Sequence, residues 1–365
     1  MMTKIFWFTS YSKESPSTRY RVTYPMNYLS EDQFKHYLYI PSAKWQRKVT
    51  LVLLLLKAYW YRNNSVVVIQ KVCTNGWYPR LLNLLISSRS VKSIYDIDDA
   101  EHLRNDNKHL NQLLTNCSSV TVGSVKLKEI YSQFNPNIRV LTSPVIDHHE
   151  YKKVRNEKLK VGWVGDTGNS QGITKDFSHK TSLFQMFFPE LKKIPFEMEL
   201  TLIGVNNEVT KQEILEYFKD TPHIELNIPM SMDWRNDQWL YQIISTFDIG
   251  VSPLVHHMYN ECKSAFKVKQ YLSAGIPVIA SDVGENKNFI SHGENGFLVN
   301  QDSDFIHYIN QIKTLSNHDY SRMVENAIQS KKLFSMENYC RKLIGEIKLL
   351  EFESNNLSVE VSGSY

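Results

Sequence analysis

Lysines stand where a short helix is expected to begin, in the segment KSAFKVKQYLSAGIPVIAS, residues 263–281. The helix dipole disfavours cations in the first turn of a helix, so a helix that only filled a core would gain nothing from Lys263 and Lys267. A helix that begins near Ser264 offers unpaired backbone N–H groups, and the two ammonium groups add positive charge. This pattern predicts a cradle for a diphosphate, and the alternative is a solvated helix face.

The turn GDTGN, residues 165–169, follows a predicted strand. Gly165 and Gly168 allow an anion to approach the backbone closely, and Thr167 and Asn169 complete the turn. The turn is therefore a second candidate anion site, and an ordinary strand-to-helix turn is the alternative.

Carboxylates cluster in YDIDDA, where Asp96, Asp98 and Asp99 stand at the expected carboxyl end of a strand. Such a cluster can bind a metal ion, orient a hydroxyl group or act as a general base. A single Asp at this place can also serve as the N-cap of the next helix. Arg19 and Arg21, in STRYR, are expected in a polar loop after the first strand.

Short β-rich runs alternate with helical patterns along the whole chain, which is typical of parallel α/β architecture. The runs are nearly continuous hydrophobic stretches, as expected of sheets that are covered on both faces. Predicted strands are residues 4–8, 36–40, 66–70, 93–96, 119–122 and 138–141, and then 160–164, 199–203, 224–226, 249–251, 278–280 and 296–299. Sheets of this kind bind ligands beyond the carboxyl ends of their strands, where the candidate residues stand.

The length of 365 residues and the hydrophobic share of 42% favour two folded domains. We predict domains at residues 1–152 and 153–335. A helix at 336–352 is expected to pack back on the first domain, and 353–365 forms a polar tail.

Charge and cysteine usage narrow the class of protein. The net charge of +4, without a dense basic block, argues against a nucleic-acid partner. The four cysteines show no CxxC spacing, so we expect neither a metal site nor disulfides. Free cysteines of this kind are typical of a protein in a reducing compartment. The N-terminus lacks the features of a signal peptide, and we expect a cytoplasmic protein. No GxSxG, HExxH, P-loop or GxGxxG motif is present, which argues against the corresponding enzyme classes.

The most apolar segment, KWQRKVTLVLLLLKAYWYR, spans residues 44–62. Its apolar run is shorter than the ~20 residues that a membrane span requires. Basic and aromatic residues flank the run, so it can lie on an anionic membrane surface. A buried leucine-rich helix of the first domain is the alternative.

The segment 263–299 resembles the donor-binding segment of retaining glycosyltransferases of family 4. The resemblance is carried by Lys267, Gln270, Gly275 and Pro277, and then by VGEN and HGENGFLV. STRYRVTYP, VVVIQK, SIYDIDDA, KVGWVGDTGN and FDIGVSPL stand where such enzymes carry comparable segments. The resemblance implies the GT-B fold, with two Rossmann-like parallel-sheet domains facing a central cleft.

This resemblance also implies an activity. A sugar would move with retention from a nucleotide-diphosphate sugar in the C-terminal domain to a saccharide or lipid-linked acceptor in the N-terminal domain. It implies chemistry without a metal or other cofactor, bacterial cell-surface polysaccharide or glycolipid synthesis, and a place at the inner face of the membrane.

The residues and the resemblance together give three groups of candidate site residues. The catalytic candidates are Lys263, Lys267, Asp98 and Asp99. The donor-binding candidates are Gly165, Thr167, Gly168, Asn169, Ala265, Phe266, Gln270, Glu285 and Asn286. Candidates for contact with the acceptor or a phosphate are Arg19 and Arg21.

One departure from the family pattern affects the sugar site. Members usually carry two Glu residues separated by seven others, and these positions are Cys262 and Gln270 here. An amide still offers a ribose hydroxyl a donor and an acceptor, whereas a thiol does not hold a sugar hydroxyl comparably. Glu261, Lys263 or the VGEN loop therefore become the expected sugar contacts. A GT-B nucleotide-sugar epimerase and a non-catalytic sugar-nucleotide-binding subunit remain open as alternatives.

Overall fold

The computed structural model describes residues 2–30, 32–42, 44–73, 76–103, 108–146, 154–168, 176–231, 233 and 235–362, with side chains up to Phe352. The chain forms two compact units. Unit 1 consists of Met1–Pro144, Cys262–Ser264 and Met336–Tyr365, and unit 2 consists of Val145–Glu261 and Ala265–Ser335. The predicted boundary between residues 152 and 153 and the predicted contact Asn169 lie outside the described residues.

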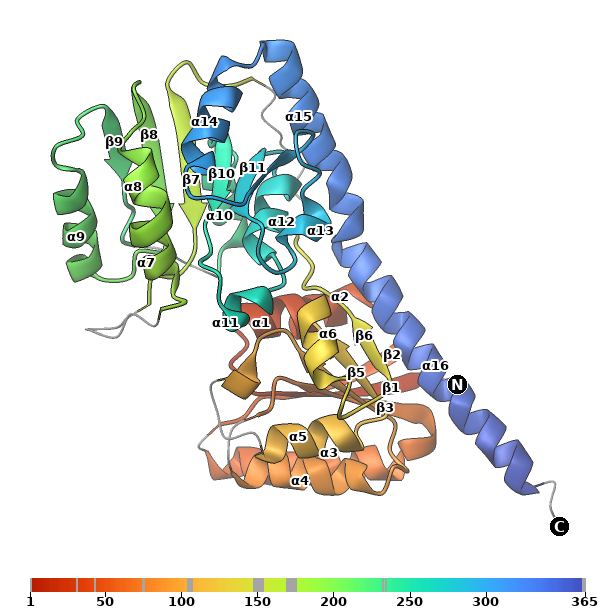
Figure 1. Cartoon of the computed structure of the whole chain (residues 1–365). Helices are drawn as coiled ribbons and strands as arrows, with labels where there is room; N and C mark the ends of the chain where they lie inside the picture. Colours follow the sequence, from red (N-terminus) through yellow and green to blue (C-terminus); the bar gives the residue numbers. More distant parts are fainter. Residues whose placement is uncertain are drawn as a thin grey trace. The chain divides into compact units, whose positions relative to one another are not determined.

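Unit 1 is built on a six-stranded parallel sheet (Figure 1). Its strands are β1 (Thr3–Thr9), β2 (Phe34–Tyr39), β3 (Ser65–Gln70), β4 (Ser93–Ile97), β5 (Ser119–Val122) and β6 (Ile138–Val140). They lie in the order β2-β1-β3-β4-β5-β6. The order therefore reverses between β1 and β3, which is the point where parallel α/β sheets commonly bind ligands.

The helices of unit 1 are mostly short and cover both faces of this sheet. They are α1 (Pro16–Thr18), η1 (Arg19–Thr23), α2 (Tyr24–Tyr28), α3 (Trp45–Trp60), η2 (Arg62–Asn64), α4 (Trp77–Ser87), η3 (Glu101–Leu103), α5 (Lys108–Asn116), α6 (Val125–Tyr131) and α16 (Met336–Ser362).

The last helix, α16, belongs to unit 1 although it follows unit 2 in the chain (Figure 1). Its Tyr339, Leu343 and Ile347 pack in one core with Trp7 and Val68 of the sheet. The helix runs on to Ser362 instead of ending at residue 352 as predicted. Neither proline nor glycine occurs after Phe352 before Gly363, so nothing in the sequence stops the helix earlier.

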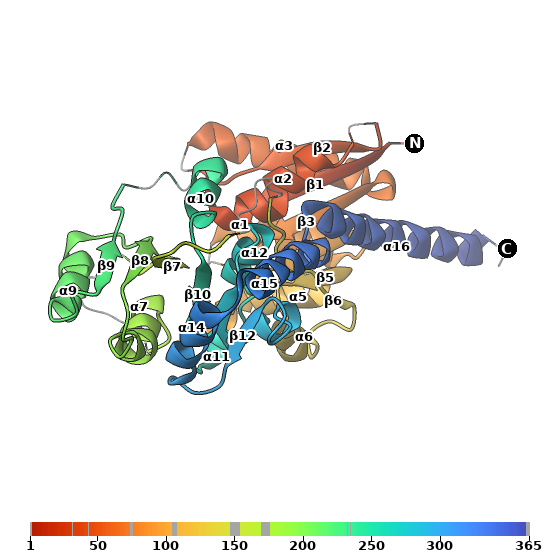
Figure 2. The same cartoon turned by 90° about the horizontal axis from the view of Figure 1, so that it is seen from above.

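Unit 2 repeats the architecture with a second six-stranded parallel sheet. Its strands are β7 (Leu159–Val164), β8 (Met198–Ile203), β9 (Ile224–Asn227), β10 (Ile249–Ser252), β11 (Val278–Ser281) and β12 (Gly296–Val299). The order is β12-β11-β10-β7-β8-β9, so β7, β8 and β9 follow one another toward one edge (Figure 1, Figure 2). The reversal lies between β7 and β10. All the predicted strands are present, although several begin or end a residue or two away from the predicted positions.

The helices of unit 2 follow its strands in the same alternating manner. They are α7 (His179–Ser182), η4 (Leu183–Phe187), α8 (Phe188–Leu191), α9 (Glu208–Phe218), α10 (Asp237–Ile244), α11 (Met258–Glu261), α12 (Phe266–Ser273), α13 (Asn286–Phe289), α14 (Asp304–Thr314), α15 (Asn317–Ser330) and η5 (Lys331–Leu333).

A buried tyrosine fixes α12 against the middle of this sheet. The Tyr271 hydroxyl accepts a hydrogen bond from the Val164 N–H at 2.8 Å and donates one to the Val251 carbonyl at 3.2 Å. A Cβ atom at Gly250 would lie 2.4 Å from the Tyr271 ring, so only glycine leaves room for this packing. The tyrosine thereby holds α12 across the strand reversal between β7 and β10.

The leucine-rich helix α3 is not a core helix, although the sequence left that interpretation open. Only Leu51 and Ala58 of this helix are buried. Leu53 and Leu56 are 61% and 62% exposed. No helix of the described residues is long and apolar enough to cross a membrane.

Candidate functional site

Lys267 lies at the strand reversal of unit 2, in the first turn of α12. A Cβ atom at Gly165, directly after β7, would lie 3.0 Å from Lys267 Cε and 2.3 Å from the Trp163 ring. The absence of a side chain at Gly165 therefore lets the lysine stem and the indole lie beside the end of the strand.

The ammonium group of Lys267 is held by two aromatic side chains. Its Nζ lies 3.0 Å from each ring nitrogen of His179 and 5.6 Å from the centre of the Trp163 ring. His179 begins α7, whose N-cap Ser178 accepts the Thr181 N–H at 3.0 Å. An ammonium group has no acceptor, so this hydrogen bond requires an unprotonated nitrogen on the imidazole.

The start of α12 differs from the sequence prediction. The helix begins at Phe266 and not near Ser264, because Ala265 adopts a left-handed conformation with φ of 54°. Ala265, the N-cap residue, has no side-chain acceptor to cap this end. A helix N-terminus that has a lysine in its first turn is the kind of end that binds anions.

The two lysines of the predicted cradle fall in different units. Cys262–Ser264 cluster with unit 1, whereas α12 belongs to unit 2. Lys263 also precedes the first turn of α12, which begins at Phe266, so it does not belong to the same unit or the same helix as Lys267.

The backbone of the glycine-containing turn is already engaged within unit 2. The N–H of Gly165 donates to Ile203 O at 2.9 Å, and that of Thr167 donates to Gly204 O at 3.1 Å. Gly168, with φ of 82°, donates its N–H to Asp166 Oδ1 at 2.6 Å. These three N–H groups thus have partners within unit 2, and Gly165 also gives space to Lys267. The donor-binding roles of Gly165, Thr167 and Gly168 stay predictions.

The other predicted donor contacts of unit 2 are largely buried. Gln270 is 3% exposed. Asn288 Nδ2 donates to Glu285 at 2.8 Å, and Asn286 Nδ2 donates to the Ser281 carbonyl at 2.9 Å. These bonds shape the VGEN loop, and the donor-binding roles of Gln270, Glu285 and Asn286 stay predictions.

Glu261 is tied to the same loop. Its carboxylate accepts the Gly284 N–H at 3.1 Å and lies 3.5 Å from His256 Nδ1. Glu261 and the VGEN loop, both named above as alternative sugar contacts in place of Cys262, are thus neighbours in unit 2.

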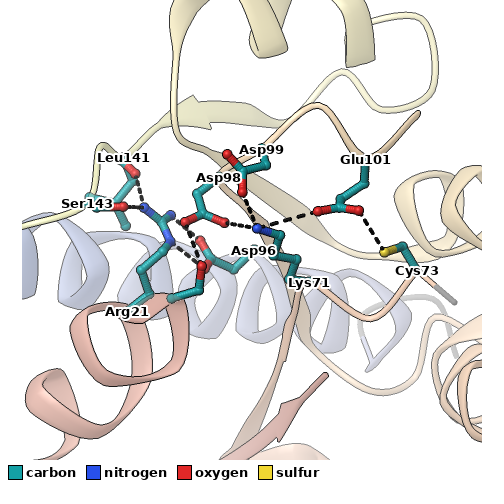
Figure 3. Close-up of polar contacts among 10 residues, drawn as sticks. Arg21, Lys71, Cys73, Asp96, Asp98, Asp99, Glu101, Leu141 and Ser143 are labelled. Carbon is teal, nitrogen blue, oxygen red and sulfur yellow. Dashed lines mark hydrogen bonds and ion pairs between the residues drawn. The ribbon is translucent and has the colours of Figure 1, made fainter. Parts of the chain in front are cut away.

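Arg21 of unit 1 is buried and not in a polar loop as predicted (Figure 3). It lies in the π-helical turn η1 and forms a bidentate pair with Asp96, in which Nε donates at 2.8 Å and Nη2 at 2.5 Å. Its Nη1 donates to Leu141 O at 2.9 Å and to Ser143 Oγ at 3.1 Å. Burial opposes the charge, but Asp96 outweighs it and raises the pKa of Arg21.

These bonds engage the Arg21 guanidinium on several sides, so the arginine holds η1 and β4 together and is not open for a phosphate. The neighbouring Arg19 is also buried in η1, with its guanidinium 5.5 Å from the centre of the Tyr20 ring.

Lys71, which was not among the predicted site residues, joins the carboxylates that follow β4 (Figure 3). It has a left-handed φ of 55° directly after β3. Its Nζ lies 3.3 Å from Asp98 and 3.4 Å from Glu101, and it also donates to Asp99. Burial opposes its charge, but Asp98, Asp99 and Glu101 together raise the pKa of Lys71.

Lys71 places a positive charge within this acidic cluster. Among the described residues, no group of three or more His, Cys, Asp or Glu side chains is arranged to hold a metal ion. Asp98 also accepts from Ser17 Oγ at 3.1 Å, and Cys73 Sγ donates to Glu101 at 3.7 Å.

Gln70, the last residue of β3, is a further buried polar group that was not among the predicted site residues. Its side chain is fully buried, and neither its oxygen nor its nitrogen has a hydrogen-bond partner among the described residues. It lies in register with Thr9 of β1 and Asp96 of β4, at the strand reversal of unit 1. A polar amide directly after the apolar run VVVI is the signal in the sequence that could have indicated it.

Part of the chain matches a known protein family. Residues 249–347 match the model of the C-terminal domain of glucosyltransferase 3-like proteins. The matched segment contains α12 with Lys267 and Gln270. None of the curated protein sequences compared with the chain matches it.

Solved structures similar to this chain include several glycosyltransferases. HepE of Anabaena in complex with UDP-glucose is 12% identical, with a TM-score of 0.62 over 94% of this chain and 99% of that one. Sucrose-phosphate synthase of Thermosynechococcus elongatus is 13% identical, with a TM-score of 0.67 over 96% of this chain and 100% of that one. The lipopolysaccharide outer core galactosyltransferase WaaB is 14% identical, with a TM-score of 0.61 over 94% of this chain and 99% of that one.

At these identities the likeness establishes the fold. The chain has the two parallel-sheet domains of the GT-B fold, which confirms the predicted fold class. The predicted resemblance to glycosyltransferases is confirmed as well.

Proposed function

We propose that the protein transfers a sugar from a uridine diphosphate sugar to an acceptor hydroxyl, with retention at the anomeric carbon. The observation that carries this proposal is Lys267 in the first turn of α12, with its ammonium group beside His179. The match of residues 249–347 to a glucosyltransferase domain supports it. The similar HepE structures, which contain UDP and UDP-glucose, favour uridine as the base.

The proposed chemistry follows from where charge develops. As the bond between the sugar carbon and the diphosphate breaks, its electron pair passes to the phosphate oxygen. Lys267 and the first-turn N–H groups of α12 stabilise this negative charge, which is commonly the largest catalytic effect. His179 is a positioning residue, because it orients the ammonium group. We propose no metal or other cofactor, since the lysine supplies the positive charge.

The acceptor belongs to unit 1 in this proposal. The acceptor oxygen forms the new bond to the sugar carbon, and its proton passes to a carboxylate, for which Asp98 and Asp99 are the candidates. Lys71 keeps both groups close together in unit 1.

The setting of the reaction is also proposed. The acceptor is a saccharide or a lipid-linked saccharide of bacterial cell-surface polysaccharide or glycolipid synthesis. The protein acts in the cytoplasm, peripherally at the inner face of the membrane.

Nucleotide binding tests the proposal first. The melting temperature should rise with UDP and UDP-glucose but not with ADP or GDP, because a ligand of the native state stabilises it by mass action. Lys267→Ala should reduce the UDP shift. Lys219→Ala should not, since this lysine is 57% exposed at the end of α9.

Transfer should then be measured with UDP-glucose and a panel of saccharide and lipid-linked acceptors. A glycosylated product that keeps the anomeric configuration of the donor is the expected result. UDP-sugar binding without turnover on any acceptor or on water would instead indicate a non-catalytic binding subunit. Interconversion of the nucleotide sugar without an acceptor would indicate an epimerase.

A further inference from the structure

Helix α3 carries a continuous apolar surface on its solvent side. Its seven exposed large apolar residues, which we name the α3 stripe, are Trp45, Val49, Val52, Leu53, Leu56, Tyr59 and Trp60. At about 100° per residue, these positions fall within an arc of about 120° on one side of the helix. Both buried residues, Leu51 and Ala58, lie on the other side, toward the rest of unit 1.

The exposure is greatest for the largest side chains. Trp45 is 67% exposed at the first residue of α3 and Trp60 is 80% exposed at its last residue. Leu53 and Leu56, between them, are 61% and 62% exposed. Contiguous exposed apolar surface of this kind on a folded protein marks an interaction site.

The charges around the α3 stripe have one sign. Lys44, Arg47 and Lys48 stand at the start of the helix, and Lys57 and Arg62 stand near its end. No Asp or Glu occurs between Asp32 and Asp96. The partner of this surface must therefore be apolar and, around the apolar part, anionic.

We propose that the α3 stripe docks the protein on the surface of a bilayer that contains anionic lipids. The apolar side chains would enter the boundary between headgroups and acyl chains, and the flanking cations would lie over the lipid phosphates. Tryptophan and tyrosine favour this interfacial depth, and Trp45 and Trp60 stand at the two ends of the stripe. Its 16 residues span ~24 Å, so the helix lies along the surface and does not cross it.

A second copy of the chain fits this surface less well. A symmetric contact would place each stripe against its own equivalent and bring the flanking lysines and arginines of the two copies together. With no carboxylate between Asp32 and Asp96, the helix and its flanks supply no opposite charge to these cations. Anionic lipid headgroups supply that charge.

The inference deepens the proposed function, because it names the surface that would hold the protein at the membrane of a lipid-linked acceptor. Its test uses no nucleotide sugar. A failure of docking would therefore leave the proposed transfer to be judged with soluble acceptors, and a failure of transfer would leave docking to be judged with vesicles.

Co-sedimentation of the full chain with lipid vesicles tests the docking. We expect binding to vesicles of phosphatidylcholine with phosphatidylglycerol, weaker binding to phosphatidylcholine alone, and a decrease as salt rises. The double variant Leu53→Ser/Leu56→Ser should lose affinity for the vesicles by about tenfold or more, because two apolar side chains no longer leave water on binding. The control Val209→Ser/Leu215→Ser removes two exposed apolar residues of α9 in unit 2 and should bind as the unchanged protein does.

Two further measurements make the result decisive. Arg47→Gln/Lys48→Gln should weaken binding at low salt. The double variant Lys211→Gln/Lys219→Gln, which changes one lysine of α9 and the C-cap residue of that helix, should not. Brominated acyl chains should quench tryptophan fluorescence in the bound protein, and less so in Trp45→Phe/Trp60→Phe. No binding at low salt, equal binding by the serine variant, or a dimer in solution that the same serine variant dissolves would overturn the proposal.

Discussion

Lys267 reaches its position because of two residues that carry no charge of their own. Gly165 leaves space for the lysine stem, and Tyr271 fixes the helix from which the lysine extends. His179 then lies within hydrogen-bond distance of the ammonium group. The charge is thus preorganised before any ligand binds, and preorganisation is what makes electrostatic stabilisation effective.

The space at Gly165 gives the first prediction. In Gly165→Ala, the new Cβ would lie 2.3 Å from the Trp163 ring and 3.0 Å from Lys267 Cε, so both side chains must move. We expect a loss of about 1–3 kcal/mol in the free energy of unfolding and weaker UDP binding. Urea unfolding and UDP titration measure the two effects. An unchanged UDP affinity in the alanine variant would show that the position of Lys267 does not matter for the nucleotide.

Gln70 gives a prediction of the opposite sign for stability. A buried amide without a partner costs about 1–3 kcal/mol of desolvation, so Gln70→Leu, of similar size, should leave the free energy of unfolding unchanged or raise it. The same variant should weaken acceptor binding if the amide meets an acceptor hydroxyl in unit 1. Denaturant unfolding and acceptor KM separate the two effects. A clear loss of stability would mean that the amide has a partner in the native protein.

At the scale of elements, the apolar runs of the sequence were sufficient to predict every strand of both sheets. A continuous run such as VVVIQ in β3 is characteristic of a strand that is covered on both faces. The local pattern does not report which distant group pairs with a polar residue. Lys71 and Asp98 are far apart in the sequence, and only the alignment of β3 beside β4 brings their ends together.

The same limit explains the elements whose details were missed. Arg21 belongs to a polar segment, and its burial depends on Asp96 from another strand. The start of α12 depends on the left-handed backbone of Ala265, which alanine rarely adopts and a sequence pattern does not indicate. For α3, the leucines gave the helix correctly, but they did not indicate which side faces the solvent.

Lys71 gives a prediction about the elements that it joins. Lys71→Met should lower the free energy of unfolding by about 3–5 kcal/mol near neutral pH, because it leaves buried carboxylates without their cation. Adding Glu101→Gln should recover part of this loss. Chemical denaturation of the single and double variants measures both effects. An equal loss with and without Glu101→Gln would contradict the described ion pairs.

The pH dependence of that loss follows from the raised pKa of Lys71. The lysine is charged in both the folded and the unfolded state below the unfolded pKa of ~10.4, so its stabilising contribution is fully present there. The contribution is lost as the pH rises above that value toward the folded pKa. The difference in unfolding free energy between the unchanged protein and Lys71→Met should therefore shrink only at strongly alkaline pH.

At the scale of the whole molecule, both units use one arrangement for their candidate residues. Each sheet reverses its strand order beside its first strand, between β1 and β3 in unit 1 and between β7 and β10 in unit 2. The polar groups of unit 1, Gln70 and Lys71, stand at the end of β3. The turn with Gly165 follows β7 in unit 2. The position of the candidate sites could thus be predicted from the α/β pattern, whereas their internal contacts could not.

The most direct measurement of the central claim is the release of UDP from UDP-glucose in the presence of water alone, since it requires no identified acceptor. We predict slow but enzyme-dependent release by the unchanged protein and by Lys219→Ala. Release by Lys267→Ala should fall on the order of a hundredfold, as expected when a preorganised charge is removed, with its melting temperature little changed in the absence of ligand. Release by folded Lys267→Ala at the rate of the unchanged protein would contradict the account.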